Sequence, residues 1–400
     1  MQKEKQVEWG EGVFTLLSWF KQERVKNARV LVAGAGALGN EVVKNLALFG
    51  VGHIYVVDFD RIEYSNLTRS VLFREEDAWN HSFKADVVAR RAMEINPHIQ
   101  VTPIVGNLFS EVGFGIYRMV DVVIGCLDSR IARYLLNRLC LRAGKKWIDG
   151  SIENLTGTVR VYSPGLNCYE CGLSREEFNI IMLRTGCADV VRAQSQAGRV
   201  ATTPISASVI GAMQVQEAMK IIHFDNNENS SHFKTLEGKI LRYEGMTNNM
   251  SIYRFASWKK NCPAHERWEN IVEGKDLSAK MTVKQVLNAL KNLLGVNALE
   301  INMRNNKFID RIIADKPEKE FSVMLPESRL DDFIENDTEL KKLSYRTLFH
   351  KSFYENLDND FPYQDMTLQQ IGIPLFDVVQ VSTDKGQFFV ELTGDADLFT

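Results

Sequence analysis

The feature that most constrains the fold is a short apolar run, residues 29–33, that leads directly into a glycine-rich turn. Behind the turn, apolar residues of the segment 40–50 recur at helical spacing. A second apolar run (53–60) ends in acidic residues, and a third (120–129) precedes another helical stretch. Alternating strands and helices predict an α/β fold of the Rossmann type, a doubly wound parallel sheet with function at the carboxyl ends of its strands.

Beyond Asp149 the alternation stops, because residues 156–163 are typical of an antiparallel strand and residues 207–222 of a buried helix. A polar loop follows at 224–233, and the composition changes again near residues 270–280. We expect a first domain at residues 1–275 and a small α+β domain at 276–400. The second domain should contain a helix, a strand and a final strand pair, at residues 281–290, 298–304, 376–381 and 386–392.

Composition excludes several functional classes. A formal charge of −3 gives no general reason to expect nucleic acid. The N-terminus has no apolar core of a secretory signal, and the most apolar long stretch, near residues 204–222, contains several polar side chains, so no membrane segment is expected. Six cysteines with a C-x-x-C pair favour metal ligands or a reactive thiol in a reducing cytoplasm over a disulfide framework.

Three glycines, Gly34, Gly36 and Gly39, form G-x-G-x-x-G between the first strand and its helix. Backbone amides and the helix N-terminus can therefore approach a phosphate or a ribose without a Cβ in the way. Asp58, at the end of the second strand, fits a ribose hydroxyl. These residues alone fit an ordinary dinucleotide fold equally well, and with it an NAD oxidoreductase.

The residues after Asp58 favour phosphoryl chemistry instead. Asn66, Arg69 and Lys84 are the side chains that orient and neutralise phosphate oxygens. The alternative for each is a solvated surface charge, and for Lys84 taken alone that interpretation is preferred. Asp128 ends the third strand, where a carboxylate beside a triphosphate would hold Mg²⁺; its alternative is a helix N-cap, a role that Ser129 could also play.

Two pairs of metal-ligand residues share one spacing, and together they predict a structural zinc site. The pairs are Cys168 with Cys171 and Cys262 with His265. Four protein ligands leave no open position for a substrate. In the alternative interpretation, His265 is a surface residue and the thiols are free.

These motifs resemble the adenylation domain of the ubiquitin-activating family, which includes the bacterial ThiF and MoeB adenylyltransferases. The resemblance covers roughly residues 24–272 and is carried by residues 34–69, Lys84 and residues 125–137. It implies that Asp58 binds the ATP ribose, that Arg69 and Lys84 bind phosphates with help from Asn66, and that Asp128 holds Mg²⁺ and is required for adenylation. Asp60 is included with the nucleotide-binding residues, its role left open. The family also implies the long gap between the two zinc pairs, with a cysteine where His265 stands.

One departure concerns the family's arginine-rich segment ahead of the first strand, which supplies an arginine to the ATP phosphates. Residues 8–27 stand in its place, and Arg24 and Lys26 do not match the motif. Either another arginine substitutes or the phosphate grip is incomplete.

Cys187 is the candidate nucleophile because it lies in a polar segment without periodicity, whereas Cys126 and Cys140 fall in apolar strand and helix contexts. In the family, a cysteine near this position can attack the adenylate, and larger activators carry the nucleophile in an inserted domain. No room for such a domain exists before Ser206. A thioester on Cys187 is the expectation, and a cysteine without a covalent role is the alternative.

Residues from about 280 to the end resemble the ubiquitin-fold (β-grasp) domain that recruits a conjugating enzyme; the alternative is a generic interaction module. The leading expectation is thus a ubiquitin-like protein activating enzyme that uses ATP, Mg²⁺ and Zn²⁺, adenylates a C-terminal glycine, and passes a Cys187 thioester to a conjugating enzyme. The alternatives are a sulfur-carrier protein adenylyltransferase and a non-catalytic scaffold subunit. The resemblance also implies a homodimer.

Overall fold

The computed structural model describes Trp9 and residues 13–185, 201–224, 233–254, 259, 261–303, 306–315, 318–344 and 349–399. The chain divides into two compact units. The first comprises Met1–Leu108 and Tyr117–Arg267, and the second comprises Phe109–Ile116 and Trp268–Thr400. The predicted domain boundary at residue 275 stays a prediction. The short segment 109–116, which belongs with the distant C-terminal part, was not foreseen.

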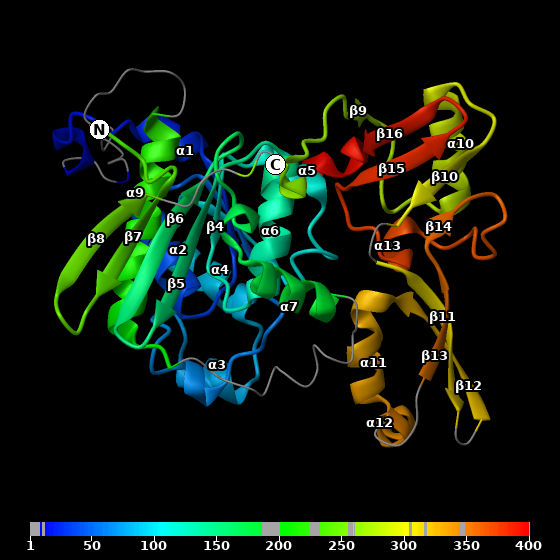
Figure 1. Ribbon diagram of the computed structural model, residues 1–400, viewed down its shortest axis with the longest axis horizontal. Helices are drawn as coiled ribbons and strands as arrows, with labels where there is room; N and C mark the ends of the chain where they lie inside the picture. Colours follow the sequence, from blue (N-terminus) through cyan, green and yellow to red (C-terminus); the bar gives the residue numbers. More distant parts are fainter. Residues whose placement is uncertain are drawn as a thin grey trace, which may run out of the picture. The chain divides into compact units, whose positions relative to one another are not determined.

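An eight-stranded sheet in the order β3-β2-β1-β4-β5-β6-β7-β8 forms the centre of the first unit. The strands are β1 (Arg29–Ala33), β2 (His53–Val57), β3 (Gln100–Ile104), β4 (Val122–Gly125), β5 (Trp147–Glu153), β6 (Thr156–Tyr162), β7 (Lys239–Glu244) and β8 (Asn249–Arg254). The strands from β3 to β5 pair in parallel, whereas β6, β7 and β8 pair antiparallel. Figure 1 shows β5 to β8 side by side. The α/β prediction with a parallel sheet is confirmed, including the change to antiparallel pairing after Asp149.

Helices follow the parallel strands as the periodicity predicts. Those of the first unit are α1 (Gln22–Asn27), α2 (Ala37–Phe49), α3 (Glu75–Trp79), α4 (Lys84–Ile95), α6 (Arg130–Arg142), α7 (Arg175–Thr185) and α9 (Pro204–Phe224), with 3₁₀ turns η1 (Phe14–Leu16), η2 (Tyr64–Asn66), η3 (Glu170–Gly172) and η4 (Pro263–His265). Helix α5 (Phe114–Met119) contains residues assigned to both units. No helix in the described part of the chain is long and apolar enough to cross a membrane.

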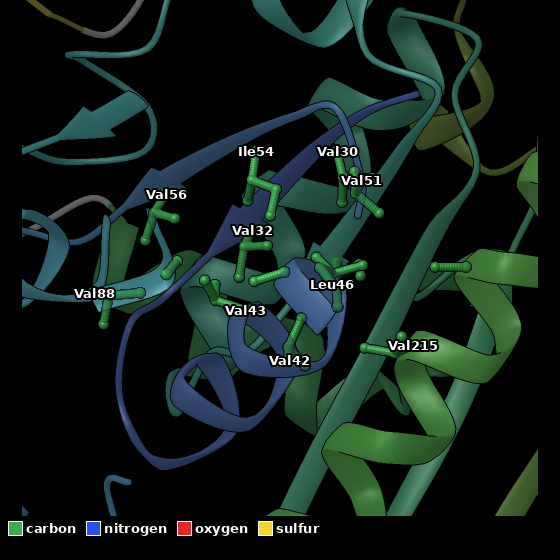
Figure 2. Close-up of a cluster of buried hydrophobic side chains, with 14 of the residues drawn as sticks. Val30, Val32, Val42, Val43, Leu46, Val51, Ile54, Val56, Val88 and Val215 are labelled. Atoms are coloured by element: carbon green, nitrogen blue, oxygen red, sulfur yellow. The ribbon is translucent and has the colours of Figure 1, made fainter. Parts of the chain in front are cut away.

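The main core lies between the sheet and α2, α4 and α9. Figure 2 shows branched side chains of β1, β2 and α2 gathered around one another: Val30, Val32, Ile54, Val56, Val42, Val43 and Leu46. All are inaccessible to solvent. Each such side chain contributes about 1.5–3 kcal/mol on burial, so this layer fixes the strands that carry the candidate site.

The second unit contains two small sheets, with strand orders β14-β10-β15-β16-β9 and β12-β11-β13. Its elements are β9 (Val272–Glu273), α10 (Val283–Leu294), β10 (Leu299–Asn302), β11 (Phe308–Asp315), β12 (Glu318–Pro326), η5 (Glu327–Arg329), α11 (Leu330–Asn336), α12 (Thr338–Ser344), β13 (Phe349–Tyr354), β14 (Asn356–Leu357), α13 (Leu368–Ile371), β15 (Val378–Thr383), β16 (Gly386–Glu391) and η6 (Thr393–Leu398). The predicted helix, strand and final strand pair correspond to α10, β10, β15 and β16. Strand β9 pairs in parallel with β16, and the other pairings are antiparallel. The ubiquitin fold remains a prediction for this unit.

Candidate nucleotide and metal sites

The glycine turn is shaped by close approaches of its own backbone. Gly34 has a φ of +99°, and a Cβ there would lie 2.5 Å from the carbonyl oxygen of Cys126. A Cβ on Gly39 would lie 2.0 Å from the oxygen of Gly34, whereas a Cβ on Gly36 would meet nothing within 4 Å. Gly36 is also the N-cap of α2. The turn is therefore packed against neighbouring backbone at Gly34 and Gly39 and has free space at Gly36. A phosphate or ribose can approach the helix N-terminus there.

Parallel register places the predicted nucleotide residues at one edge of the sheet. Ala33, the last residue of β1, pairs with Val57 of β2 and with Gly125 of β4. The residues that follow these three positions leave the sheet at the same carboxyl edge. We call this region the nucleotide edge: the turn 34–39, Asp58 with Asp60 and Lys84, and the loop 126–129.

Asp58 ties the glycine turn to the end of β2. Its Oδ2 accepts a hydrogen bond from the Ala35 N–H (2.7 Å), and its Oδ1 accepts one from the Asp60 N–H (2.8 Å). Burial raises the pKa of the Asp58 carboxyl above its usual value, and the Lys84 ammonium acts in the opposite direction. The carboxylate keeps lone pairs for a ribose hydroxyl, the role that the resemblance implies.

Lys84 is buried, with 9% of its surface exposed, so the interpretation of Lys84 as a solvated surface charge is wrong. Its ammonium pairs with the Asp60 carboxylate at 2.6 Å, and its backbone N–H donates to the Asp60 carbonyl oxygen. Lys84 is the first residue of α4, where the helix dipole disfavours a cation. Asp60 compensates that charge, and a phosphate group could take the same place beside it.

Asn66 and Arg69 are engaged locally, in and after η2. The buried Asn66 accepts a hydrogen bond from the Glu63 N–H through Oδ1 (3.0 Å). Arg69 is half-buried and donates to the carbonyl oxygen of Ser65 (2.6 Å). Their predicted contacts with phosphates stay predictions.

Asp128 is exposed, and the neighbouring Ser129, not Asp128, caps the following helix. Ser129 is the N-cap of α6, with its hydroxyl accepting from the Ala132 N–H. Within the described ranges, the Asp128 carboxylate takes part in no hydrogen bond or ion pair. Since the capping alternative is wrong for Asp128, an unpaired carboxylate remains at the nucleotide edge, as a hard cation such as Mg²⁺ requires.

Two side chains that the sequence analysis missed, one buried and one mostly buried, hold this edge in place. Asn40 is inaccessible; its Nδ2 donates to the oxygens of Ala35 (2.8 Å) and Gly36 (3.0 Å), and its Oδ1 accepts from the Leu72 N–H (2.9 Å). Arg133 pairs with Asp149 at 2.8 Å and donates to the carbonyl oxygen of Leu127. Nothing in the sequence distinguishes Asn40 from the other polar residues of α2, such as Glu41 and Asn45.

A polar cavity of about 270 Å³ opens beside the loop that carries Asp128. Its lining residues are Arg130, Arg133, Asp149, Ser151, Arg160, Tyr169, Gly172, Leu173 and Glu177. Two of its arginines are already paired, Arg133 with Asp149 and Arg130 with Glu177 at 3.0 Å. The cavity therefore offers a polar surface next to the nucleotide edge.

The four predicted metal ligands lie together, with one ligand atom of each within 4.8 Å of the others. Cys168 Sγ is 3.7 Å from both Cys171 Sγ and Cys262 Sγ, and Cys171 Sγ is 3.5 Å from His265 Nε2. Bonds of about 2.3 Å to sulfur and 2.0–2.1 Å to nitrogen give tetrahedral edges of about 3.8 and 3.6 Å. We call these four residues the metal cluster. Their spacing fits a zinc ion, and it contradicts the alternative in which His265 is an unrelated surface residue.

Cys126 and Cys140 lie outside the metal cluster. Cys140 is buried and Cys126 partly so, and burial raises the pKa of both thiols, which makes both poor nucleophiles. Cys187, the candidate nucleophile, lies outside the described residues. Arg24, noted in place of the arginine motif, donates to the carbonyl oxygen of His223 near the end of α9.

Comparisons with known proteins support the fold of the first unit. The model of the ThiF family matches residues 10–264. The chain is 32% identical over 231 residues, 56% of its length, to the sulfur carrier protein adenylyltransferase of Thermus thermophilus, of which 78% is covered. It is 31% identical over 242 residues to the adenylyltransferase and sulfurtransferase MOCS3 of Drosophila sechellia, and 35% identical over 153 residues to the SUMO-activating enzyme subunit uba-2 of Caenorhabditis elegans.

The matched region is only part of some relatives. It spans 60% of this chain and 49% of the MOCS3 protein, and 38% of this chain and 26% of uba-2. Among solved structures, Escherichia coli MccB with ATP shares the fold, with a TM-score of 0.51 and 23% identity over 66% of this chain and 75% of that one. Residues 265–400 lie beyond the family match.

Proposed function

Because the chain belongs to the ThiF family, we propose that it is an ATP-dependent adenylyltransferase that activates the C-terminal carboxylate of a ubiquitin-like or sulfur carrier protein. The observation that carries the proposal is the nucleotide edge. There an open glycine turn and the carboxylate of Asp58 accompany an unpaired carboxylate, Asp128, at the ends of neighbouring parallel strands. A non-catalytic scaffold would not need to keep this set.

In the proposed reaction, a carboxylate oxygen of the protein substrate attacks the α-phosphorus of ATP, pyrophosphate leaves, and an acyl adenylate forms. Asp58 accepts a hydrogen bond from a ribose hydroxyl, and the α2 N-terminus at Gly36 faces the phosphates. Lys84 and Arg69 neutralise the charge that develops on the phosphate oxygens. Asp128 would hold Mg²⁺, which supplies further charge neutralisation on the triphosphate.

In this reaction the Lys84 ammonium, which pairs with Asp60 in the free protein, must also contact a phosphate of ATP. The Asp60 carboxylate is about half exposed, with 51% of its side chain accessible, while Lys84 is buried. Asp60 can therefore turn to solvent at low cost when a phosphate arrives. This exchange gives Asp60 a role that the family resemblance left open, namely to hold Lys84 in place before ATP binds.

The metal cluster is proposed to be a structural zinc site with Cys168, Cys171, Cys262 and His265 as ligands. Its spacing supports four protein ligands, which leaves no position for a substrate. The proposed ion would join the loop after β6 to η4, two segments that are 94 residues apart in the chain.

Two outcomes remain open after the adenylate. The Thermus and Drosophila relatives are named for sulfur carrier chemistry, which favours a sulfur-carrier adenylyltransferase. The uba-2 relative is named for SUMO activation, which favours a thioester on Cys187 and transfer to a conjugating enzyme recruited by the second unit. Homodimerisation and a cytoplasmic location belong to both versions.

The test of the shared step is ATP–pyrophosphate exchange in the presence of Mg²⁺ and a ubiquitin-like or sulfur carrier protein that ends in glycine. Exchange that depends on the protein substrate supports the proposal, and its absence with every such substrate contradicts it. A non-reducing gel then separates the two outcomes. A thiol-sensitive band that Cys187→Ala abolishes indicates the thioester, whereas exchange without a band indicates the sulfur-carrier version.

A further inference from the structure

Gln214 is a polar side chain on α9 that is inaccessible to solvent and contacts the sheet where β4 ends. Its Nε2 donates a hydrogen bond to the carbonyl oxygen of Gly125 (2.9 Å) and a longer one to that of Ile148 on β5 (3.4 Å). Its Oε1 faces the Cys126 thiol, 4.0 Å from Sγ. Because carbonyl oxygens can only accept, the amide nitrogen must face the strands, and the orientation of the amide is fixed.

Two glycines allow α9 to bring this amide against the sheet. A Cβ on Gly150 of β5 would lie 2.4 Å from both Cδ and Oε1 of Gln214. One helical turn earlier, Ile210 lies in the same way against Gly157 of β6, where a Cβ would be 2.4 Å from Ile210 Cγ1. The two contacts share one face of the helix. Of the two side chains, only that of Gln214 can form hydrogen bonds with the strands.

The peptide that Gln214 contacts begins the loop that leads to Asp128. Gly125 is the last residue of β4, and the next residue, Cys126, donates its N–H to the Ala33 oxygen at the end of β1 (2.8 Å). Gln214 and Ala33 thus hold the start of the loop 126–129 from two different elements, α9 and β1. The Asp128 carboxylate has no hydrogen bond or ion pair within the described ranges, so its place depends on the backbone of this loop.

We propose that Gln214 is a positioning residue for the metal that accompanies ATP: its hydrogen bond to the Gly125 oxygen sets where the Asp128 carboxylate meets Mg²⁺. The inference rests on the proposed function and adds to it a residue that lies outside the nucleotide edge. Mg²⁺ demands near-ideal octahedral geometry, with bonds of about 2.0–2.1 Å. A loop that is displaced at its start therefore binds the metal less tightly, although Asp128 itself is unchanged.

The first test compares Gln214→Met with Gln216→Met in the full-length chain. Methionine keeps the length of the side chain and removes the donor. Gln216 is the matched control because it lies two residues further along α9 and is exposed. ATP affinity is measured by titration calorimetry, once with Mg²⁺ and once with EDTA. Gln214→Met should lower the affinity with Mg²⁺ by about 10-fold and leave the affinity with EDTA unchanged, whereas Gln216→Met should match the wild type in both.

A second variant disturbs the same amide from the sheet side and serves if Gln214→Met does not fold. Gly150→Ala places a Cβ where the Gln214 amide lies, and should lower the Mg²⁺-dependent affinity by a similar factor. The two substitutions should not add, because they remove the same hydrogen bond. Gly157→Ala is the control for strain, since its Cβ meets Ile210 on the same helix. It should lower the melting temperature without changing the ATP affinity of the folded protein.

The failures can be told apart. Wild-type protein that binds ATP equally well with Mg²⁺ and with EDTA overturns this inference, and if it also performs no pyrophosphate exchange the proposed function falls with it. Mg²⁺-dependent affinity that is unchanged in Gln214→Met and Gly150→Ala overturns this inference alone. Equal losses with Mg²⁺ and with EDTA also overturn it, because Gln214 would then support the whole ATP site. Wild-type exchange without any such effect leaves the proposed function intact.

Discussion

The nucleotide edge and the metal cluster are assembled in opposite ways. At the nucleotide edge, strand register and backbone hydrogen bonds fix the glycine turn, and the reactive carboxylate of Asp128 is left exposed and unpaired. In the metal cluster, four side chains from two segments distant in sequence place their ligand atoms within 4.8 Å of one another. The first site should therefore lose function without losing stability, and the second should lose stability when a ligand is removed.

The largest effect is expected for Asp128→Ala. Loss of a charged group that acts on the developing transition state should reduce ATP–pyrophosphate exchange by about 10²-fold or more. The free energy of unfolding should change by less than about 0.5 kcal/mol, since the side chain is exposed. Asp86→Ala, at an exposed aspartate on α4, is the control and should keep full exchange. A large loss of stability in Asp128→Ala would remove the contrast between the two sites.

The metal cluster should show the reverse pattern. Cys168→Ser should abolish stoichiometric zinc binding and lower the melting temperature by about 5–10 °C, because metal-binding free energy contributes to folding. Cys140→Ala is the matched loss of a buried thiol outside the cluster, and zinc content should stay at the wild-type level. Metal analysis with thermal denaturation checks both variants. Unchanged zinc content in Cys168→Ser would argue against the ligand set.

A smaller effect tests how far the nucleotide edge depends on buried hydrogen bonds. Asn40→Ala leaves the Leu72 N–H and the Ala35 oxygen unpaired, and should cost about 1–3 kcal/mol of unfolding free energy. ATP affinity should fall with it, because the glycine turn loses a support. Urea titrations give the stability, with Asn80→Ala, at an exposed asparagine, as the near-neutral control. Full stability in Asn40→Ala would show that the turn is held by its backbone alone.

The smallest effect concerns the pH dependence of Asp58. Burial raises the pKa of its carboxyl in the folded protein. Such an acid stabilises the folded state most below its unfolded pKa, about 4, and this contribution is lost as the pH rises through the folded pKa. The unfolding free energy of the wild type minus that of Asp58→Asn should therefore fall as the pH increases from 4 upward. A difference that rises over this range would mean that hydrogen bonds to the ionised form outweigh burial.

Local patterns made the sheet and the glycine turn predictable from sequence. Apolar runs with two-residue or helical periodicity predict strands and helices, and G-x-G-x-x-G after a strand predicts a tight turn into a helix. Local patterns could not show which side chain forms an ion pair with a given charged residue. Lys84 taken alone favours a surface charge, and only the family resemblance predicts that it binds phosphate. Its pairing with Asp60, 24 residues earlier, depends on the path of the loop between them.

In the metal cluster, too, the sequence predicted only residues with a characteristic spacing. Its ligands were found because C-x-x-C and C-x-x-H have a characteristic spacing, even though the pairs lie 94 residues apart. Asn40 belongs to no such spacing, and its importance follows from its burial and from the direction of its amide. Other polar residues occur in the same helix, so the sequence does not single Asn40 out.

The segment 109–116 has a consequence for biosynthesis. The N–H of Phe114 donates to Asp377 Oδ1 at 2.8 Å, across a sequence separation of 263 residues, and both residues belong to the second unit. A ribosome completes the early part of this unit long before its partner emerges. Contacts of such separation form late and slowly in folding. Residues 109–116 therefore cannot make these contacts before residue 377 has been synthesised, and until then they stay accessible to proteases.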